Sequence, residues 1–455
     1  MYNAFTEDAA LPIPLSLFSA ETWATDSDAL PTAVRVFAEA QGFRAGQGQL
    51  VLMPDESGAL ACVLGGLGDG KDALAVAAIS SKLPAGDYAV DRAPADWNSA
   101  WIAAGWSDGT YRFERYLAES DAPPRLVLPS DVDVSALRRE AEAVSKLRDM
   151  VNTPAADMGP SSIQSEISAM AEAFGATLET VIGDALLEQN YPMVHAVGRA
   201  AEDAPRIMEL SWGEESAPEL AIVGKGVAFD TGGLNLKTGN YMRLMKKDMG
   251  GAAHAIALAR LVMGANLPVR LKLYVPAVEN AIAGNAFRPG DILQSRKGLT
   301  VEIDNTDAEG RLILGDALAR ACEGSPDLLI DFATLTGAAR IALGPDLAPV
   351  YTDDDALAAA FEAGAAVSGD PVWRMPLWDP YLKMLKSPIA DIVNSASGFA
   401  GSITAALFLK QFVDAPSWAH LDVWAWREGK YGRPAGGAAC GLRAAWAMVQ
   451  HRYAD

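Results

Sequence analysis

Residues 299–322 read LTVEIDNTDAEGRLILGDALARAC. The first five have the apolar, β-branched character of a short strand, and residues 312–322 place apolar side chains at helical spacing. The polar residues between them therefore predict a turn from a strand into a helix. In open α/β sheets, ligands bind beyond the carboxyl ends of the strands, where such turns lie. This stretch predicts an α/β fold with a functional site at the turn.

The turn carries two carboxylates, Asp307 and Glu309, separated by one residue. Alternate residues of an extended chain point to the same side, so we expect these carboxylates to lie together. Neighbouring carboxylates repel, and one of them takes up a proton unless a cation holds both ionised. A metal ion is one such cation, and Arg311 adds a charge that does not titrate in proteins. Taken alone, such a pair is more often a solvated surface pair than a functional site.

A second group of charged residues lies upstream. Residues 220–224, LAIVG, predict a buried strand, and Lys225, Lys237 and two aspartates follow it between glycine-rich turns. The pooled carboxylates are Asp230, Asp248, Asp307 and Glu309. Each carboxylate carries one negative charge, and two divalent ions would balance the charge of all four. Oxygen-rich ligand sets of this kind suit two bridged metal ions in a hydrolytic enzyme.

Three segments of the chain resemble motifs of the leucyl aminopeptidase family of di-zinc exopeptidases. These segments are NTDAEGRL (305–312), VGKGVAFDTGG (223–233) and MKKDMGG (245–251). Their order and spacing also agree with the family, and the resemblance is strong over residues 149–437. It implies a leucyl aminopeptidase-type metallo-aminopeptidase. Such an enzyme removes the N-terminal residue, leucine or another mostly apolar one, from peptides with a water activated by two metal ions.

The resemblance also implies roles for individual residues. The implied metal ligands are Lys225, Asp230, Asp248, Asp307 and Glu309. They would hold two divalent ions per chain, Zn²⁺ or Mn²⁺, and a lysine can ligate a metal only when it is neutral. The implied catalytic residues are Lys237, which would stabilise the oxyanion, and Arg311, which would hold a bicarbonate as general base.

Six further residues stand at positions that lie near the substrate in the family. They are Met245, Asn305, Thr334, Leu335, Gly337 and Trp424. Ordinary core packing is the alternative reading of the apolar ones. Several family members have small residues where this chain has Trp424, so we expect its ring to narrow the pocket. That departure puts the preference for leucine in question.

The composition limits the partners. The 455 residues carry a formal net charge of −21 and include no long basic run. Because phosphate affinity depends on clustered lysine and arginine, no nucleic-acid partner is expected. No apolar stretch is long enough to span a membrane, and residues 1–16 lack the pattern of a secretory signal. The three cysteines are odd in number and far apart, as expected in a reducing compartment, so we predict a cytoplasmic protein.

The pattern along the chain predicts three parts. Residues 1–133 would form a small N-terminal α/β domain with a structural or assembly role, and residues 134–160 a linker helix and turn. Residues 161–455 would form the catalytic domain, with a mostly parallel mixed sheet covered by helices on both faces. Its predicted strands are 207–212, 219–224, 269–275, 300–303, 328–334 and 420–424. Its main predicted helices are 161–174, 251–263, 312–322, 353–366 and 403–409.

Peptides are the expected substrates, and the resemblance implies a homohexamer. Trp418, Trp424, Trp426 and Trp446 add apolar area that could be buried between chains or within one core. The rival enzyme class is another two-metal hydrolase such as a phosphatase, but the chain lacks a basic cluster that would cradle phosphate. A protein of the same fold with only an assembly or DNA-architectural role is the non-enzymatic rival. The complete set of matched charged residues argues against it.

Overall fold

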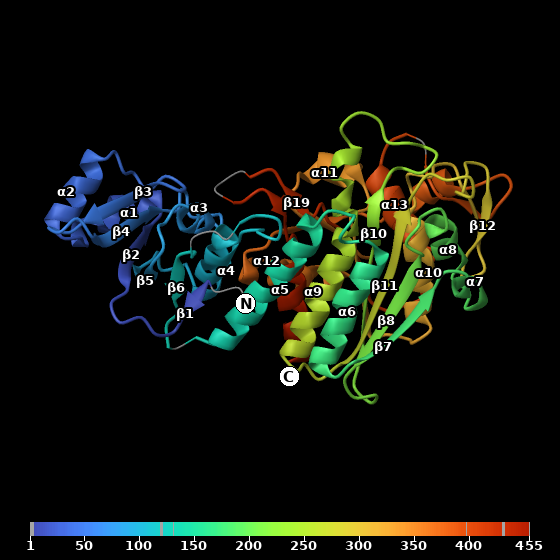
Figure 1. Ribbon diagram of the computed structural model, residues 1–455, viewed down its shortest axis with the longest axis horizontal. Coiled ribbons are helices and arrows are strands. Elements are labelled where there is room, and N and C mark those ends of the chain that lie inside the picture. Colours follow the sequence, from blue (N-terminus) through green and yellow to red (C-terminus); the bar gives the residue numbers. More distant parts are fainter. Residues whose placement is uncertain (1–3, 119–121, 131, 397, 430–432, 455) are drawn as a thin grey trace. The chain divides into compact units, whose positions relative to one another are not determined.

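The computed structural model describes residues 4–118, 122–130, 132–396, 398–429 and 433–454 (Figure 1). The chain forms two compact units. The first comprises Met1–Ser145 and Arg427–Gly436, and the second comprises Lys146–Trp426 and Gly437–Asp455. In the part of the chain that the structure describes, every helix is too short or too polar to cross a bilayer.

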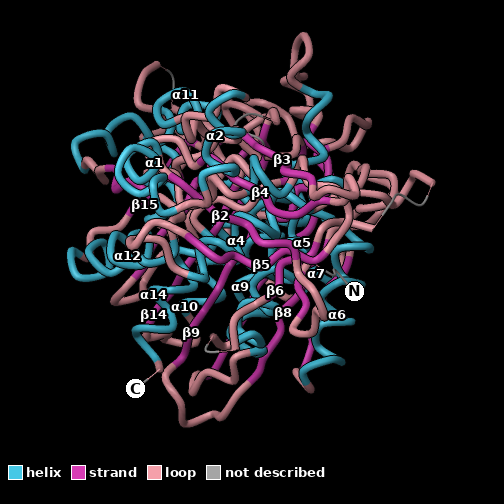
Figure 2. The backbone as a smooth tube through the Cα atoms, turned by 90° about the vertical axis from the view of Figure 1, so that its left-hand side faces the viewer, coloured by secondary structure: helices cyan, strands magenta, loops and turns pink. Residues whose placement is uncertain are grey.

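The first unit is built on a six-stranded sheet in the order β1-β6-β5-β2-β4-β3, whose strands are parallel except for β3. Strands β2 to β6 of this sheet are labelled in Figure 2. The strands are β1 (Phe5–Thr6), β2 (Ile13–Phe18), β3 (Leu50–Pro54), β4 (Leu60–Gly66), β5 (Asp87–Arg92) and β6 (Arg125–Val127). The helices are α1 (Ala20–Asp26), α2 (Thr32–Ala40), α3 (Ala77–Ser80) and α4 (Ser99–Thr110), with the short 3-10 turn η1 (Ser27–Ala29). Leu15, Val63, Tyr88 and Trp106 are buried in its core.

The second unit contains a larger mixed sheet in the order β16-β15-β18-β14-β9-β11-β8-β7, with β10 also paired to β11. Its central strands β18, β14, β9 and β11 are mutually parallel, whereas β8 near one edge pairs antiparallel with both β11 and β7. The strands are β7 (Thr177–Ile182), β8 (Arg206–Trp212), β9 (Glu219–Gly224), β10 (Gly226–Asp230), β11 (Arg270–Asn280), β14 (Leu328–Ala333), β15 (Ala348–Tyr351), β16 (Val372–Met375) and β18 (Trp418–Asp422). The predicted mostly parallel sheet is confirmed.

Helices cover both faces of this sheet (Figure 1). On one face α6 (Pro160–Phe174) and α9 (Gly250–Gly264) pack on the strands, and α14 (Leu442–Tyr453) packs on α9 and α12 (Asp355–Ser368). On the other face α8 (Pro192–Gly198) and α10 (Gly310–Cys322) pack on β11, and α13 (Gly401–Lys410) packs on α10. The shorter helices are α7 (Ala185–Glu188), α11 (Gly337–Leu343), η2 (Met242–Met249) and η3 (Asp379–Leu385). This burial on two faces explains the near-continuous apolar runs of the central strands.

The strand that precedes the 305–311 turn was wrongly expected in the main sheet. Strand β13 (Thr300–Glu302) instead belongs to a separate three-stranded sheet, antiparallel to β12 (Ile292–Gln294) and parallel to β17 (Ile392–Val393). A three-residue strand does not indicate by its own sequence which strand it pairs with, because the pairing depends on residues far away in the chain. The two remaining strands are β19 (Trp426–Arg427) and β20 (Gly436–Gly437).

The division into units differs from the predicted ranges 1–133, 134–160 and 161–455. Helix α5 (Val134–Asn152) contains the division, which falls between Ser145 and Lys146. The first part of α5 belongs to the first unit because Ala141 and Leu137 pack in its hydrophobic core. Residues 427–436 also group with the first unit, which interrupts the range predicted for the catalytic domain.

Candidate metal centre and active site

The predicted site residues meet at the carboxyl ends of the central strands. Lys225 follows β9, Asp230 ends β10, and Thr334 follows β14. They border a cavity of about 800 Å³ in the second unit. Every site residue predicted from the sequence lines it: Lys225, Asp230, Lys237, Met245, Asp248, Asn305, Asp307, Glu309, Arg311, Thr334, Leu335, Gly337 and Trp424. The fold therefore brings together segments that are up to two hundred residues apart in sequence.

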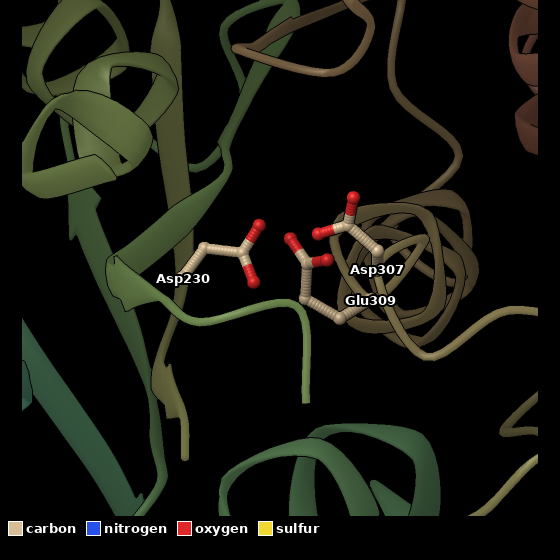
Figure 3. Close-up of side chains that lie close together, drawn as sticks. All are labelled: Asp230, Asp307 and Glu309. Carbon is tan, nitrogen blue, oxygen red and sulfur yellow. The ribbon is translucent and has the colours of Figure 1, made fainter. Parts of the chain in front are cut away.

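Three of the carboxylates that line this cavity point toward one another (Figure 3). Asp230, Asp307 and Glu309 each offer an oxygen, and these oxygens lie within 4.8 Å of one another. Asp230 and Glu309 are almost completely buried, while the side chain of Asp307 is 33% exposed. Residues 304–309 form a turn and not an extended segment, so the expected alternation does not explain the meeting. The turn itself brings Asp307 and Glu309 to the same place.

Two lysines contact these carboxylates. The Nζ atom of Lys225 lies 2.6 Å from Asp248 Oδ2 and 3.1 Å from Glu309 Oε1, and it also donates to the Thr334 carbonyl at 2.9 Å. The Nζ atom of Lys237 lies 2.7 Å from Asp230 Oδ2 and 2.5 Å from Asp307 Oδ1. Together these pairs link all four predicted carboxylate ligands to the two lysines.

The crowding of charge shifts the pKa values of the site. Burial and the charge of Asp230 raise the pKa of Glu309 to about 8 and that of Asp307 to about 6. Burial alone would lower the pKa of Lys225, but Asp248 and Glu309 outweigh it and raise that pKa above its ordinary value. Burial alone would raise the pKa of Asp248, yet Lys225 and Lys247 hold it below its usual range. The carboxylates therefore need positive charge nearby to remain ionised.

The donor set fits a divalent cation. Glu309 is 1% exposed, and within the described ranges its Oε2 atom has no hydrogen-bond partner. A buried carboxylate oxygen without a partner is costly, and coordination to a cation removes that cost. Carboxylates of Asp230, Asp248 and Asp307 surround the same space. Oxygen ligands at this density suit Mn²⁺ or Mg²⁺, and Zn²⁺ also binds carboxylates.

Neighbouring groups hold the carboxylates in place. Asp230 Oδ1 accepts hydrogen bonds of 2.8 Å from the Asn280 side chain and from the backbone N–H of Gly232. Thr334 donates its hydroxyl to Asp248 Oδ1 at 2.9 Å. Such outer contacts orient ligating side chains before a metal binds.

The 305–311 turn is held by asparagines. Asn394 accepts from the backbone N–H of Asp304 at 2.9 Å and donates to the carbonyl of Asn305 at 2.7 Å. The side chain of Asn305 accepts from the backbone N–H of Asp307 at 2.8 Å. Asn305 thus lines the cavity while it also shapes the loop that carries Asp307 and Glu309.

Arg311 lies at the start of α10, directly after Glu309 and Gly310. Its Nη1 donates to the Asn394 carbonyl at 2.7 Å, and burial lowers its pKa to about 10. Among the residues with described positions, none accepts a hydrogen bond from its buried Nε. The guanidinium borders the cavity and has donor capacity for an anion.

The substrate side of the cavity is formed mainly by Met245, Thr334, Leu335, Gly337 and Trp424. The Asp422 carboxylate, at the end of β18, anchors this wall. It accepts from the backbone N–H of Leu335 at 2.9 Å and from the Thr336 hydroxyl at 2.6 Å.

Four residues that support the site were not among the predicted ones. They are Lys247, Asn280, Asn394 and Asp422. Lys247 stands beside Asp248 in the third motif, so a second lysine next to a predicted ligand was a usable signal. Asn280 ends β11, and Asn394 follows β17. A polar residue at a strand end is a weaker signal, because most such residues only terminate the strand.

Known proteins resemble this chain over most of its length. The sequence profile "Cytosol aminopeptidase family, catalytic domain" matches residues 145–445, and "M17 aminopeptidase, N-terminal domain" matches residues 13–129. A probable cytosol aminopeptidase of Synechococcus sp. is 39% identical over 359 residues, which are 75% of this chain and 73% of that protein.

Solved structures are similar over nearly the whole chain. The cytosol aminopeptidase of Coxiella burnetii has a TM-score of 0.92 and 41% identity, and the match covers 98% of both chains. The bottromycin maturation enzyme BotP in complex with Mn has a TM-score of 0.86 and 32% identity, covering 97% of this chain and 100% of that one. The fold, the site and these relatives identify an enzyme of the metal-dependent aminopeptidase type, and the chain belongs to the cytosol aminopeptidase family.

Proposed function

We propose that this enzyme removes the N-terminal residue of peptides by hydrolysis with two divalent metal ions. The carboxylate cluster carries the proposal. Asp230, Asp307 and Glu309 converge in an open cavity, and the Oε2 atom of Glu309 is unpartnered among the described residues. Mn²⁺ is a candidate ion because BotP was solved with it, and Zn²⁺ is the other.

The ions would be held by Lys225, Asp230, Asp248, Asp307 and Glu309. When bound, they would supply a water acidic enough to attack at neutral pH and a Lewis acid for the peptide carbonyl. Lys225 would have to give up its proton to act as a ligand, since an ammonium group has no free electron pair.

Lys237 and Arg311 would act directly on the reacting groups. Lys237 borders the cavity with its Nζ between two carboxylates, so its charge can stabilise the oxygen of a tetrahedral intermediate. Arg311 cannot serve as a base at neutral pH. Its unpartnered Nε, within the described part of the chain, supports a bound bicarbonate that takes the proton from the attacking water.

The first residue of the substrate would lie against Met245, Leu335 and Trp424. These side chains offer apolar area, which favours leucine and other apolar first residues. The free α-amine of the peptide would lie beside the carboxylate cluster, and this requirement confines cleavage to the chain end. A cytoplasmic location is part of the proposal, supported by the name "cytosol aminopeptidase" that the relatives carry.

The test compares hydrolysis of leucine p-nitroanilide with hydrolysis of p-nitrophenyl phosphate, before and after complete chelation. We expect activity on the aminoacyl substrate alone, loss of it after chelation, and recovery with Zn²⁺ or Mn²⁺. Metal analysis should find up to two ions per chain. Activity that survives complete removal of metal would overturn the metal mechanism, and failure on every aminoacyl substrate would overturn the proposed function.

A further inference from the structure

The two oxygens of the Asp248 carboxylate have different partners. Oδ2 accepts a hydrogen bond of 2.6 Å from the Nζ atom of Lys225, which is itself one of the proposed metal ligands. Oδ1 accepts from the hydroxyl of Thr334 at 2.9 Å and from the Nζ atom of Lys247 at 3.1 Å. Asp248 is 3% exposed, so bulk water has almost no access to either oxygen. One oxygen therefore lies beside a proposed ligand, and the other is held by two donors that are not proposed ligands.

The end of the Lys247 side chain is fixed by an aromatic ring. Lys247 and Asp248 are neighbours in η2, and side chains at successive helical positions point in different directions, so their contact needs a further support. The Nζ atom of Lys247 lies 4.3 Å from the centroid of the Trp424 ring, and the guanidinium carbon of Arg340 lies at the same distance from that ring. A cation–π contact at this distance is attractive. Trp424 therefore holds the amine of Lys247 beside Asp248 Oδ1.

The hydroxyl of Thr334 does not fix Oδ1 by itself. Its oxygen lies 2.9 Å from Asp248 Oδ1 and also 2.9 Å from the backbone carbonyl oxygen of Asp248. A hydroxyl has one proton to donate, so these two acceptors share it. The amine of Lys247 has several N–H groups and gives Oδ1 a hydrogen bond of its own. Lys247 is therefore the donor that determines how firmly this oxygen is held.

We propose that Lys247 is a positioning residue that restricts Asp248 to a single ligand atom, Oδ2, and thereby makes the metal centre select Mn²⁺ over Ca²⁺. This inference rests on the proposed function, because it concerns the ions that the aminopeptidase would bind. To present both oxygens to one ion, the carboxylate would have to turn Oδ1 away from Lys247 and Thr334. In a buried site those donors would then be left without an acceptor, which is costly.

Divalent ions differ in how much they need the second oxygen of a carboxylate. Ca²⁺ takes about six to eight oxygen ligands and often binds both oxygens of one carboxylate. Mn²⁺ and Zn²⁺ have smaller coordination shells, which carboxylates bound through one oxygen can fill together with water. Restriction of Asp248 to Oδ2 therefore removes a ligand that Ca²⁺ needs and that the smaller ions do not.

The experiment measures metal affinity and does not depend on catalysis. The chelated enzyme is titrated with Mn²⁺ by calorimetry, and the affinity for Ca²⁺ is measured by competition with Mn²⁺. The ratio of the two affinities is obtained within one preparation, so a fraction of inactive protein does not change it. We expect the wild type to prefer Mn²⁺, and we expect Lys247→Met to lower the Mn²⁺-to-Ca²⁺ ratio by about tenfold, the lower end of the effect of losing an outer contact to a metal ligand.

Two further variants separate the hydrogen bond from a general effect on η2. Lys247→Gln keeps an N–H donor on a shorter side chain and should restore part of the ratio. Lys246→Met is the matched control. Lys246 is the neighbouring lysine, but it donates to the Asn152 carbonyl, lies 5.5 Å from the Trp426 ring and does not line the cavity. Its substitution should leave the ratio unchanged, and an equal loss in both methionine variants would overturn the inference.

Thermal melts of the chelated proteins show whether Lys247→Met folds. If it does not fold, Trp424→Leu provides the second variant, because it removes the ring that supports the amine and leaves Lys247 itself in place. This variant should lower the Mn²⁺-to-Ca²⁺ ratio in the same direction but by less than Lys247→Met would. A folded Trp424→Leu protein with the ratio of the wild type would contradict the support that the ring is proposed to give.

A crystal structure of the wild type with Mn²⁺ tests the ligand atom directly. It should show Oδ2 of Asp248 on the ion and Oδ1 still bonded to Lys247 and Thr334. Both oxygens of Asp248 on one ion, or an unchanged ratio in Lys247→Met, refutes this inference alone, provided that the wild type binds Mn²⁺ and hydrolyses leucine p-nitroanilide. A wild type that binds no Mn²⁺ after chelation and hydrolyses no aminoacyl substrate refutes the proposed function.

Discussion

The two lysines of the candidate metal centre differ in their surroundings. The side chain of Lys225 is 3% exposed and is enclosed by Asp248, Glu309 and the Thr334 carbonyl. The side chain of Lys237 is 13% exposed and contacts Asp230 and the partly exposed Asp307. An enclosed amine suits a permanent ligand, whereas an amine on the open side can reach a substrate that arrives later. This contrast supports the different roles proposed for the two residues.

Substitutions should separate these roles. We expect Lys237→Ala to lower kcat by about 10²–10³ with little change in KM and near-normal metal content, because the lost contact belongs to the transition state. Asp248→Ala should instead lose metal. Measuring kcat, KM and metal content on the same preparations distinguishes a catalytic role from a role in metal binding. Loss of metal from Lys237→Ala would contradict the proposed division of labour.

A buried histidine behind the site should make stability depend on pH. His254 is fully buried in α9, where its Nδ1 donates to the Gly250 carbonyl and its Nε2 accepts from the backbone N–H of Cys440. The contact with Cys440 requires an unprotonated Nε2, so the two contacts exist together only in the neutral ring. Burial outweighs the effects of Gly250 and Asp370 and lowers the pKa of His254 to about 4, against an ordinary value of 6.5.

The sign follows from proton binding. Between pH 6.5 and 4 the unfolded chain binds a proton at His254 that the folded chain does not bind. Stability from this group is therefore complete above pH 6.5 and falls by at most about 1.4 kcal/mol per pH unit toward pH 4. Thermal melts of the wild type and His254→Gln should show a stability difference that shrinks as the pH falls. A difference that stays constant from pH 7.5 to 4.5 would exclude the role of His254.

At the scale of elements, the first residue of α10, Gly310, lies against the side chain of Lys225, which follows β9. A Cβ atom on Gly310 would lie 2.3 Å from Lys225 Cε and 2.7 Å from its Nζ. Glycine is therefore required here for close approach, so that the Lys225 side chain can pass the first turn of α10 and reach Glu309. Gly310 of the 305–312 motif thus leaves the space that Lys225 of the 223–233 motif occupies.

Gly310→Ala should consequently damage the site more than the fold. Alanine favours helix, so α10 itself loses nothing, but Lys225 must move away from Asp248 and Glu309. We expect a loss of bound metal and at least tenfold lower kcat/KM, with the melting temperature of the chelated protein changed by only a few degrees. Gly315→Ala is the contrasting variant. Its Cβ would meet Met193 and Phe412 in the core, so it should lower stability first.

The elements that local sequence specifies were predictable. Helices α9 and α10 and strands β9 and β14 lie close to their predicted ranges, because each combines an apolar pattern with a clear boundary. Strand β10 is not among the predicted strands, because five residues between Lys225 and a glycine turn do not indicate which strand they pair with. The matched charged residues were found through motifs. The contacts of Trp424 with Lys247 and Arg340 could not be found this way, because they depend on how distant segments pack.

At the scale of the whole molecule, assembly remains a prediction. Trp418 and Trp446 are each 7% exposed and belong to the interior of the chain, so they no longer argue for a partner. Other large apolar side chains are exposed on the second unit, among them Trp373, Trp378 and Phe399. Burial of such groups between identical chains usually gives closed symmetry.

A hexamer would contain six chains of 47.9 kDa, about 287 kDa in total. Light scattering at micromolar concentration should find this species, and Trp373→Glu or Trp378→Glu should shift it toward smaller forms if these side chains lie between subunits. Lys383→Glu serves as the control, because Lys383 is also exposed and lies close in sequence to Trp378. A fully active particle of 47.9 kDa would contradict the hexamer.

Strand β18 comes late in the chain but lies inside the main sheet, between β14 and β15. Its last residue, Asp422, accepts hydrogen bonds from Leu335 and Thr336 in the cavity wall, and Trp424 lies two residues further along the chain. During synthesis on the ribosome, the sheet therefore keeps a gap until these residues leave the exit tunnel. A partly synthesised chain that ends before Asp422 therefore lacks one wall of the catalytic cavity. The order of the strands therefore delays completion of the catalytic cavity until translation is nearly complete.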